Sequence, residues 1–271
     1  MEFFKISLFF KLDRVTKIHE IPNNKGNALA YSSAYIQQEA FNAKMSQEEF
    51  LCQTAFNLTK SIEGGTPLTL VEYHLENSDD STSPSSIIYS FLNFEWAIVS
   101  DVDYESEKYR RSLGSARFTF VALQRIAFLR VYRGKLSFIQ ANSNDEWTHL
   151  NEQNYVLLLI SCLPLISRDF MSSPHIKSFD ESHVHLTFVT EGITKCQLIK
   201  LFLSTNTGQH LNMNNVHVHN YKIKEFRFEP IIGNSNRNRR EGIMMIDGER
   251  VAHHNRVYGR VRPGMARVLT R

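Results

Sequence analysis

The 271-residue sequence has few cysteines, no long apolar run and little net charge. Its three cysteines, Cys52, Cys162 and Cys196, are widely spaced, which argues against a disulfide framework and favours reduced thiols. No stretch approaches the roughly 20 apolar residues of a membrane span. The uncharged run at residues 6–10 is too short for a signal peptide. We therefore expect a cytoplasmic protein with peripheral association to membranes.

The net charge of +3 is too small to predict a nucleic-acid partner. It suits an anionic ligand, or a basic face resting on an anionic membrane. The basic stretch at residues 234–242 lacks interleaved aromatic residues, so we interpret it as a hairpin loop and not as an RNA-binding site. With 42% hydrophobic residues, the chain is long enough for one large or two ordinary domains with a buried core.

Histidines recur in pairs at positions 183 and 185, 217 and 219, and 253 and 254. Two histidines at i and i+2 on a strand point to the same face and could hold a metal together. No cysteine or carboxylate recurs at a matching offset, so we interpret them as half-exposed strand histidines and predict no metal site. No G-x-S-x-G sequence is present, and a nucleophile elbow of the hydrolase type is therefore not indicated.

The chain divides at Glu63–Pro67, where two glycines and a proline interrupt the pattern. Before this point we predict a turn at 22–27 and helices at 27–41 and 46–61. After it, helices are expected at 116–134 and 194–205, and strands at 67–76, 87–99, 135–140, 155–163, 184–190, 215–230, 242–251 and 256–263. A polar hairpin loop is expected at 77–86. The pattern predicts an α+β, mainly β protein, with domain 1–65 followed by an antiparallel β-sandwich at 66–271.

Four acidic and four basic residues lie between two apolar segments, in the stretch from Ser100 to Phe118, SDVDYESEKYRRSLGSARF. A charged run of this kind is usually a solvated loop. The alternative is a site that needs a carboxylate close to an arginine fork.

This stretch, with LRVYRGKLSF after it, resembles the sphingosine kinases, members of the diacylglycerol-kinase-like lipid kinase family. Three more segments agree in order: NKGNALA (24–30), FVTEGITKCQLIKLFLSTNTGQHL (188–211), and MMIDGERV followed by RVRPGMARVL. The resemblance covers residues 22–271. It implies a remnant of an N-terminal α/β catalytic domain before a C-terminal β-sandwich, and transfer of the γ-phosphoryl of ATP, with Mg²⁺, to the primary hydroxyl of sphingosine or a related sphingoid base.

The resemblance also implies which residues bind the substrates. Asp103 would hold the amino-alcohol head of the lipid, because a carboxylate accepts hydrogen bonds from an ammonium and a hydroxyl. The lipid tail would lie against Val102, Phe118, Phe202 and His210. The nucleotide would contact Asn24, Lys25, Gly26, Glu107, Arg110, Arg117, Asp247, Gly248 and Glu249. Planar guanidinium groups suit phosphate oxygens.

Three departures from the family pattern stand out. Asn24 and Lys25 replace a glycine and a serine or threonine of the phosphate turn, and Ser112 is inserted between the arginines. The G-D-G aspartate that serves as general base does not occur in the residues before Pro22. We therefore assign no catalytic base and expect a truncated isoform, an incomplete gene model or an inactive copy. A ceramide or diacylglycerol kinase relative and a non-catalytic lipid-binding module remain as alternatives.

Overall fold

The computed structural model describes residues 28–36, 65–76, 86–231, 242–251 and 256–268. The turn at 22–27, the helix at 46–61, nearly all of the loop at 77–86 and most of the basic stretch at 234–242 lie outside these residues. The division into domains 1–65 and 66–271 stays a prediction.

Most of the described strands form one 11-stranded sheet in the order β12-β11-β3-β6-β4-β10-β13-β1-β2, with β5 beside β4 and β9 between β10 and β6. All of its pairings are antiparallel, as predicted. Its strands are β1 (Thr66–Glu76), β2 (Ser86–Ser90), β3 (Asn93–Ala97), β4 (Tyr132–Gln140), β5 (Trp147–His149), β6 (Gln153–Ser161), β9 (Val184–Thr190), β10 (Val218–Pro230), β11 (Met245–Ile246), β12 (Glu249–Arg250) and β13 (Arg256–Val268).

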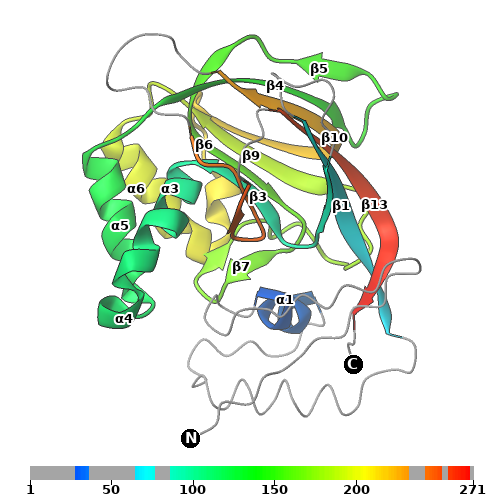
Figure 1. Cartoon of the computed structure of the whole chain (residues 1–271), viewed down its shortest axis with the longest axis horizontal. Helices are drawn as coiled ribbons and strands as arrows, with labels where there is room; N and C mark the ends of the chain where they lie inside the picture. Colours follow the sequence, from blue (N-terminus) through cyan, green and yellow to red (C-terminus); the bar gives the residue numbers. More distant parts are fainter. Residues whose placement is uncertain (1–27, 37–64, 77–85, 232–241, 252–255, 269–271) are drawn as a thin grey trace, which may run out of the picture.

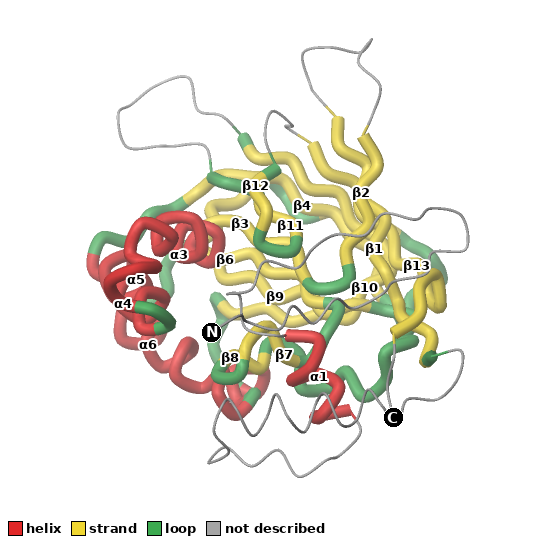
Figure 2. Tube along the Cα trace, turned by 60° about the horizontal axis from the view of Figure 1, so that its bottom comes forward, coloured by secondary structure: helices red, strands yellow, loops and turns green. Residues whose placement is uncertain are grey.

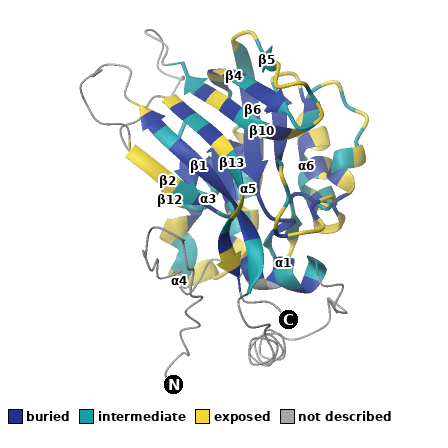
Figure 3. Ribbon diagram, turned by 90° about the vertical axis from the view of Figure 1, so that its right-hand side faces the viewer, coloured by how far each residue is buried: buried dark blue, intermediate teal, exposed yellow. Residues whose placement is uncertain are grey.

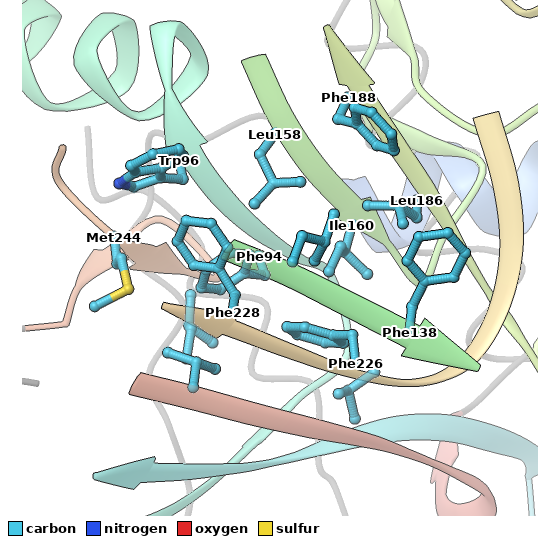
Figure 4. Packing of buried hydrophobic residues seen from close by; sticks show 14 of the residues in the cluster. Phe94, Trp96, Phe138, Leu158, Ile160, Leu186, Phe188, Phe226, Phe228 and Met244 are labelled. Atoms are coloured by element: carbon cyan, nitrogen blue, oxygen red, sulfur yellow. The ribbon is translucent and has the colours of Figure 1, made fainter. Parts of the chain in front are cut away.

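The sheet folds back on itself through its longest strands. The first half of β10 pairs with β9, and its second half pairs with β4 and β13. The folded sheet thereby forms two layers. The main core is enclosed between these layers and is rich in aromatic side chains. Phe94 of β3 lies 5.7 Å from Phe226 and 5.9 Å from Phe228 between ring centroids, both on β10 (Figure 4). The predicted antiparallel sandwich is thus confirmed.

Helices cover one outer face of the sandwich (Figures 1 and 2). They are α3 (Ile98–Ser106), α4 (Arg110–Leu113), α5 (Ala116–Ala127) and α6 (Lys195–Ser204), with short 3₁₀ turns η1 (Glu107–Tyr109), η2 (Thr205–Thr207) and η3 (Gln209–Asn212). A second apolar cluster joins this layer to the sheet, with Ile98, Ile126 and Leu201 on the helices and Leu157 and Val189 on the strands. Among the described residues, no helix is long and apolar enough to cross a membrane.

Helix α1 (Ala28–Ile36) rests on the small hairpin of β7 (Leu165–Ser167) and β8 (Phe170–Met171). The hydroxyl of Ser32 donates to the Leu165 carbonyl at 3.2 Å, and the same hydroxyl accepts a hydrogen bond from the Leu165 amide. Figure 3 shows the residues of α1 that face the sandwich as buried. The part of the predicted helix beyond Ile36 lies outside the described residues.

Two predicted strands are divided in the structure. The segment at 87–99 bends at Phe91 and Leu92, so that β2 pairs with β1 while β3 pairs with β6, and its last two residues already belong to α3. The segment at 242–251 turns at Asp247 and Gly248 to form β11 and β12. The predicted helix at 116–134 ends at Ala127, and β4 begins at Tyr132.

Candidate functional site

Helix α3 begins directly after β3, at a strained residue. Ala97 has φ 66° and ψ −131°, a conformation that L-residues rarely adopt and that tends to occur at functional sites. The hydroxyl of Ser100 donates to the Ala97 carbonyl at 2.9 Å and stabilises this turn. The charged stretch that follows is therefore helical and not an irregular loop.

Acidic side chains on one face of α3 form hydrogen bonds and ion pairs with neighbouring elements. Asp101 is 2% exposed and accepts hydrogen bonds from the hydroxyl of Tyr132 and, at 3.2 Å, from Nη1 of Arg130. The same Nη1 donates to Glu105 at 2.8 Å, and Nε of Arg125 lies 3.4 Å from Glu105. Burial raises the pKa of Asp101, against the opposing effects of Tyr132 and Arg130. These contacts fix the orientation of α3.

The next acidic side chain, Glu107 in η1, brings together the two arginines assigned to the nucleotide. Arg110 donates to its carboxylate at 2.6 Å and Arg117 at 2.9 Å. Arg117 is only 2% exposed, whereas the side chain of Glu107 is 51% exposed. Hydrogen bonds from Arg110 and then Arg117 lower the pKa of Glu107. Two guanidinium groups thus converge on one accessible anionic group despite the inserted Ser112.

Asp103 lies between these two sets of contacts. It is half-buried, and its carbonyl accepts a hydrogen bond from the Ser106 hydroxyl at 3.0 Å. The pKa of Arg110 is raised mainly by Glu107, and the charge of Asp103 adds to this effect. The structure therefore brings Asp103, Glu107, Arg110 and Arg117 together at the end of α3. The electrostatic field there favours both an ammonium near Asp103 and an anion near the arginines.

The β11–β12 hairpin approaches the same helix. Arg250 stacks on Tyr104 of α3, with its guanidinium carbon 5.6 Å from the ring centroid. Asp247 and Gly248 have φ of 50° and 76°, which suits a tight two-residue hairpin turn. Glu249 is exposed at the start of β12.

The carboxylate of Asp247 forms hydrogen bonds with the segment between β2 and β3. It accepts hydrogen bonds from the Ser90 hydroxyl at 2.6 Å and from three backbone amides, those of Phe91, Leu92 and Asn93, at 3.0–3.2 Å. Burial raises its pKa, while these donors act in the opposite direction. Asp247 thus creates the bend between β2 and β3, a structural role that the sequence analysis did not identify.

The residues assigned to the lipid tail are only partly brought together. Val102 and Phe202 both pack against the apolar cluster between the helices and the sheet. Phe118 lies under Arg117, whose guanidinium carbon is 4.5 Å from the ring centroid. His210 is buried, and its Nε2 lies 3.2 Å from the Ser172 carbonyl oxygen. Asn24, Lys25 and Gly26 lie outside the described residues.

The histidine prediction needs one correction. His183, His217 and His219 are half-buried as expected, but only His219 of these three lies on a strand, and His185 is 4% exposed and packs against His175. His253 and His254 lie outside the described residues. Within the part of the chain that the structure describes, no three His, Cys, Asp or Glu side chains have the arrangement of a metal site.

Sequence comparison connects the chain with sphingosine kinases. It is 29% identical to sphingosine kinase 1 of Rattus norvegicus over 256 residues, which cover 84% of this chain and 61% of the rat protein. It is 27% identical to sphingosine kinase 1 of Homo sapiens over 271 residues, 90% of this chain and 65% of the human protein. A 57-residue region is 53% identical to sphingosine kinase B of Dictyostelium discoideum. The chain therefore spans less than two thirds of the rat and human proteins. No protein-family model matches it.

Structural comparison agrees on the fold. A candidate diacylglycerol kinase from Bacillus anthracis str. Sterne superposes with a TM-score of 0.52 at 12% identity, covering 92% of this chain and 69% of that one. A second structure from the same source gives a TM-score of 0.51 at 15% identity. Over most of its length, the chain is a homologue of the sphingosine kinases, built on the fold of the diacylglycerol-kinase-like lipid kinases.

Proposed function

We propose that this chain forms the lipid-head and phosphate-binding part of an ATP-dependent sphingoid-base kinase. The observation that carries the proposal is the convergence of Arg110 and Arg117 on one accessible carboxylate beside Asp103. The similarity to sphingosine kinases supports the reaction class.

Asp103 would select the lipid by its charge. A sphingoid base carries an ammonium and a primary hydroxyl, and a carboxylate accepts hydrogen bonds from both. Diacylglycerol and ceramide have no cationic amine, so they lack the charge-assisted part of this interaction. Arg130 binds both Asp101 and Glu105 of α3, whereas the charge of Asp103 acts on Arg110.

The arginines would bind phosphate oxygens in place of the Glu107 carboxylate. Phosphoryl transfer depends mainly on positioning and on neutralising charge, and two guanidinium groups supply both. Mg²⁺ normally reaches such sites on the phosphates of ATP together with one or two carboxylates. Among the described residues, no group of three His, Cys, Asp or Glu side chains could hold a metal ion, so we assign no residue to Mg²⁺. No described residue is assigned as the general base.

An exposed apolar surface supports the proposed peripheral contact with membranes. Phe120 and Leu123 of α5 are 48% and 54% exposed, and Phe128, just after that helix, is 70% exposed. Lys108 and Arg111 are exposed nearby in η1 and α4. Apolar side chains beside basic ones suit the boundary of an anionic bilayer, where a sphingoid base would be found.

The proposed head-group site can be tested by measuring how tightly the variant Asp103→Asn binds lipids. We expect the affinity for sphingosine in detergent micelles to fall roughly 10–100-fold, because a charged hydrogen bond contributes about 1.5–3 kcal/mol. Binding of diacylglycerol and ceramide should be weak in the parent chain and unchanged in the variant. Calorimetric titration measures all three.

Asp145→Asn is the matched control, since Asp145 is an exposed aspartate that pairs with Lys224 far along the chain from α3. It should leave sphingosine binding unchanged. Equal sphingosine affinity for Asp103→Asn and the parent chain would contradict the proposed head-group site. Preferential binding of diacylglycerol would favour the neutral-lipid alternative.

A further inference from the structure

Four histidines from separate segments meet beneath the sandwich, on the face opposite its main core. His185 lies at the start of β9, His183 and the exposed His175 lie in the 172–183 segment that precedes this strand, and His210 lies in η3. The ring of His185 is 5.8 Å from that of His175 and 6.1 Å from that of His183 between centroids. The charges of His175 and His210 both act on His185. We call these four residues the histidine cluster.

The cluster is poor in hydrogen-bond partners. Among the described residues, neither ring nitrogen of His185 has a partner, and the same is true of Nδ1 of His210. The buried hydroxyls of Ser161 and Ser173 also have none, and Ser161 is paired with His185 across β6 and β9. A buried neutral imidazole without partners is tolerable, whereas a buried imidazolium without partners is strongly destabilising.

Few negative charges face the cluster. Lys222 of β10 is paired with His185, and β6 contributes only the uncharged Ser161 there. The carboxylate of Glu181 lies 3.7 Å from Nδ1 of His183, and no other described carboxylate is paired with a member of the cluster. Burial, followed by the charges of His183, Lys222, His175 and His210, lowers the pKa of His185 to about 3. Burial also lowers the pKa of His183 and His210.

The 172–183 segment covers the cluster and joins it to neighbouring elements. Its Ser172 carbonyl accepts from His210 when Nε2 carries the proton, at 3.2 Å. Its Phe179 carbonyl accepts from the Thr69 amide of β1 at 2.8 Å. Its Pro174 carbonyl accepts from the hydroxyl of Tyr35 in α1 at 2.9 Å. The segment therefore links the histidines to both the sheet and α1.

From this arrangement we propose that the histidine cluster is an acid-sensitive latch, which holds the 172–183 segment, and with it α1, on the sandwich. In neutral solution the buried imidazole of His185 is uncharged and the segment stays docked. In acid, protonation favours the undocked state, where water solvates the imidazolium ions. The inference does not depend on the proposed kinase function.

The direction of the pH dependence follows from the pKa of His185 in the docked and undocked states. A histidine in the undocked segment has its ordinary pKa of about 6.5, and His185 in the docked state has a pKa of about 3. Docking stability is therefore fully present above pH 6.5 and is lost as the pH falls towards 3. For His185 alone, lowering the pH from about 8 to about 5 should raise the opening constant roughly 30-fold.

Amide hydrogen exchange measures this opening directly. After correction for the intrinsic pH dependence of exchange, we expect protection of Ser173, Ile176 and Thr69 to fall at least 10-fold between pH 8 and pH 5. In His185→Gln, which cannot gain the proton, most of this fall should disappear. His149→Gln alters an exposed histidine of β5 outside the cluster and should keep the full pH response.

An NMR titration of the histidine ring protons in the unmodified chain provides a test that needs no variant. The latch predicts that His185 remains neutral down to about pH 5 in the native protein. A native pKa near 6.5 would overturn the proposal, as would an equal loss of protection in the parent chain and in His185→Gln. Strong Zn²⁺ binding abolished by His185→Gln would also overturn it and would assign the cluster to a metal.

Discussion

At the scale of single residues, the acidic side chains of the charged stretch have two different tasks. Asp101 and Glu105, four positions apart on one helical face, bind Arg130 and stabilise the fold. Glu107 gathers Arg110 and Arg117, with Asp103 beside them. The engagement of Asp101 by Tyr132 and Arg130 also makes it a poor candidate for a general base.

The anchoring role of Asp101 can be tested through its partner. Tyr132→Phe removes the hydroxyl that donates to Asp101 and leaves a buried carboxylate with one donor fewer. We expect the free energy of unfolding to fall by about 1–3 kcal/mol. Urea denaturation measures the change. Tyr104→Phe, at an exposed position of α3, should change stability by less than about 0.5 kcal/mol; an equal effect of both substitutions would refute the anchoring role.

The sequence predicted part of this site. The charged stretch and its resemblance to a known family placed Asp103, Glu107, Arg110 and Arg117 in one short segment, and a helical segment keeps such residues close in space. The roles of Arg130, Tyr132 and Asp247 were not predicted, because each acts through contacts between residues distant in the chain. Burial of His185 was missed for the same reason.

At the scale of elements, strand identity was easier to predict than strand boundaries. The strand at 184–190 was predicted with its observed limits, since its apolar residues largely alternate with polar ones. The apolar run at 87–99 gave no sign of the bend at Phe91 and Leu92, because the carboxylate that creates it belongs to Asp247. Local patterns do not report such distant hydrogen bonds.

A carboxylate of β1 forms an ion pair with an arginine of β13, and the stability that it contributes depends on pH. Glu72 accepts a hydrogen bond from Arg262 at 2.9 Å and others from His74 and Tyr89. The bond from Arg262 is the main cause that lowers the pKa of Glu72 to about 2. Because this pKa lies below the ordinary value of 4.5, the stabilisation is present above pH 4.5 and is lost as the pH falls towards 2.

Glu72→Gln should therefore lower the free energy of unfolding at pH 7 by about 1–2 kcal/mol. The difference between variant and parent should shrink between pH 4.5 and pH 2, as shown by denaturant titrations at a series of pH values. Glu76→Gln, at the exposed end of the same strand, serves as the control. A difference that stays constant across this range would show that the charge of Glu72 does not support the pairing.

At the scale of the whole molecule, the sandwich serves as a support for the site. Strand β3 leads directly into α3, β4 supplies Tyr132, and β12 brings Arg250 against Tyr104. Three parts of the sheet thus hold one helix in a fixed position. Such support suits the proposed phosphoryl transfer, a reaction that depends on precise placement of charges more than on covalent chemistry.

The proposed function requires that Arg110 and Arg117 bind phosphate at this position. Calorimetric titration of the purified 271-residue chain with ATP tests it most directly, with Arg110→Gln compared against Arg111→Gln, the neighbouring arginine. We predict saturable ATP binding that weakens roughly 10-fold or more in Arg110→Gln and stays within about twofold of the parent in Arg111→Gln. Absence of ATP binding in the parent chain, or equal effects of the two substitutions, would contradict the claim.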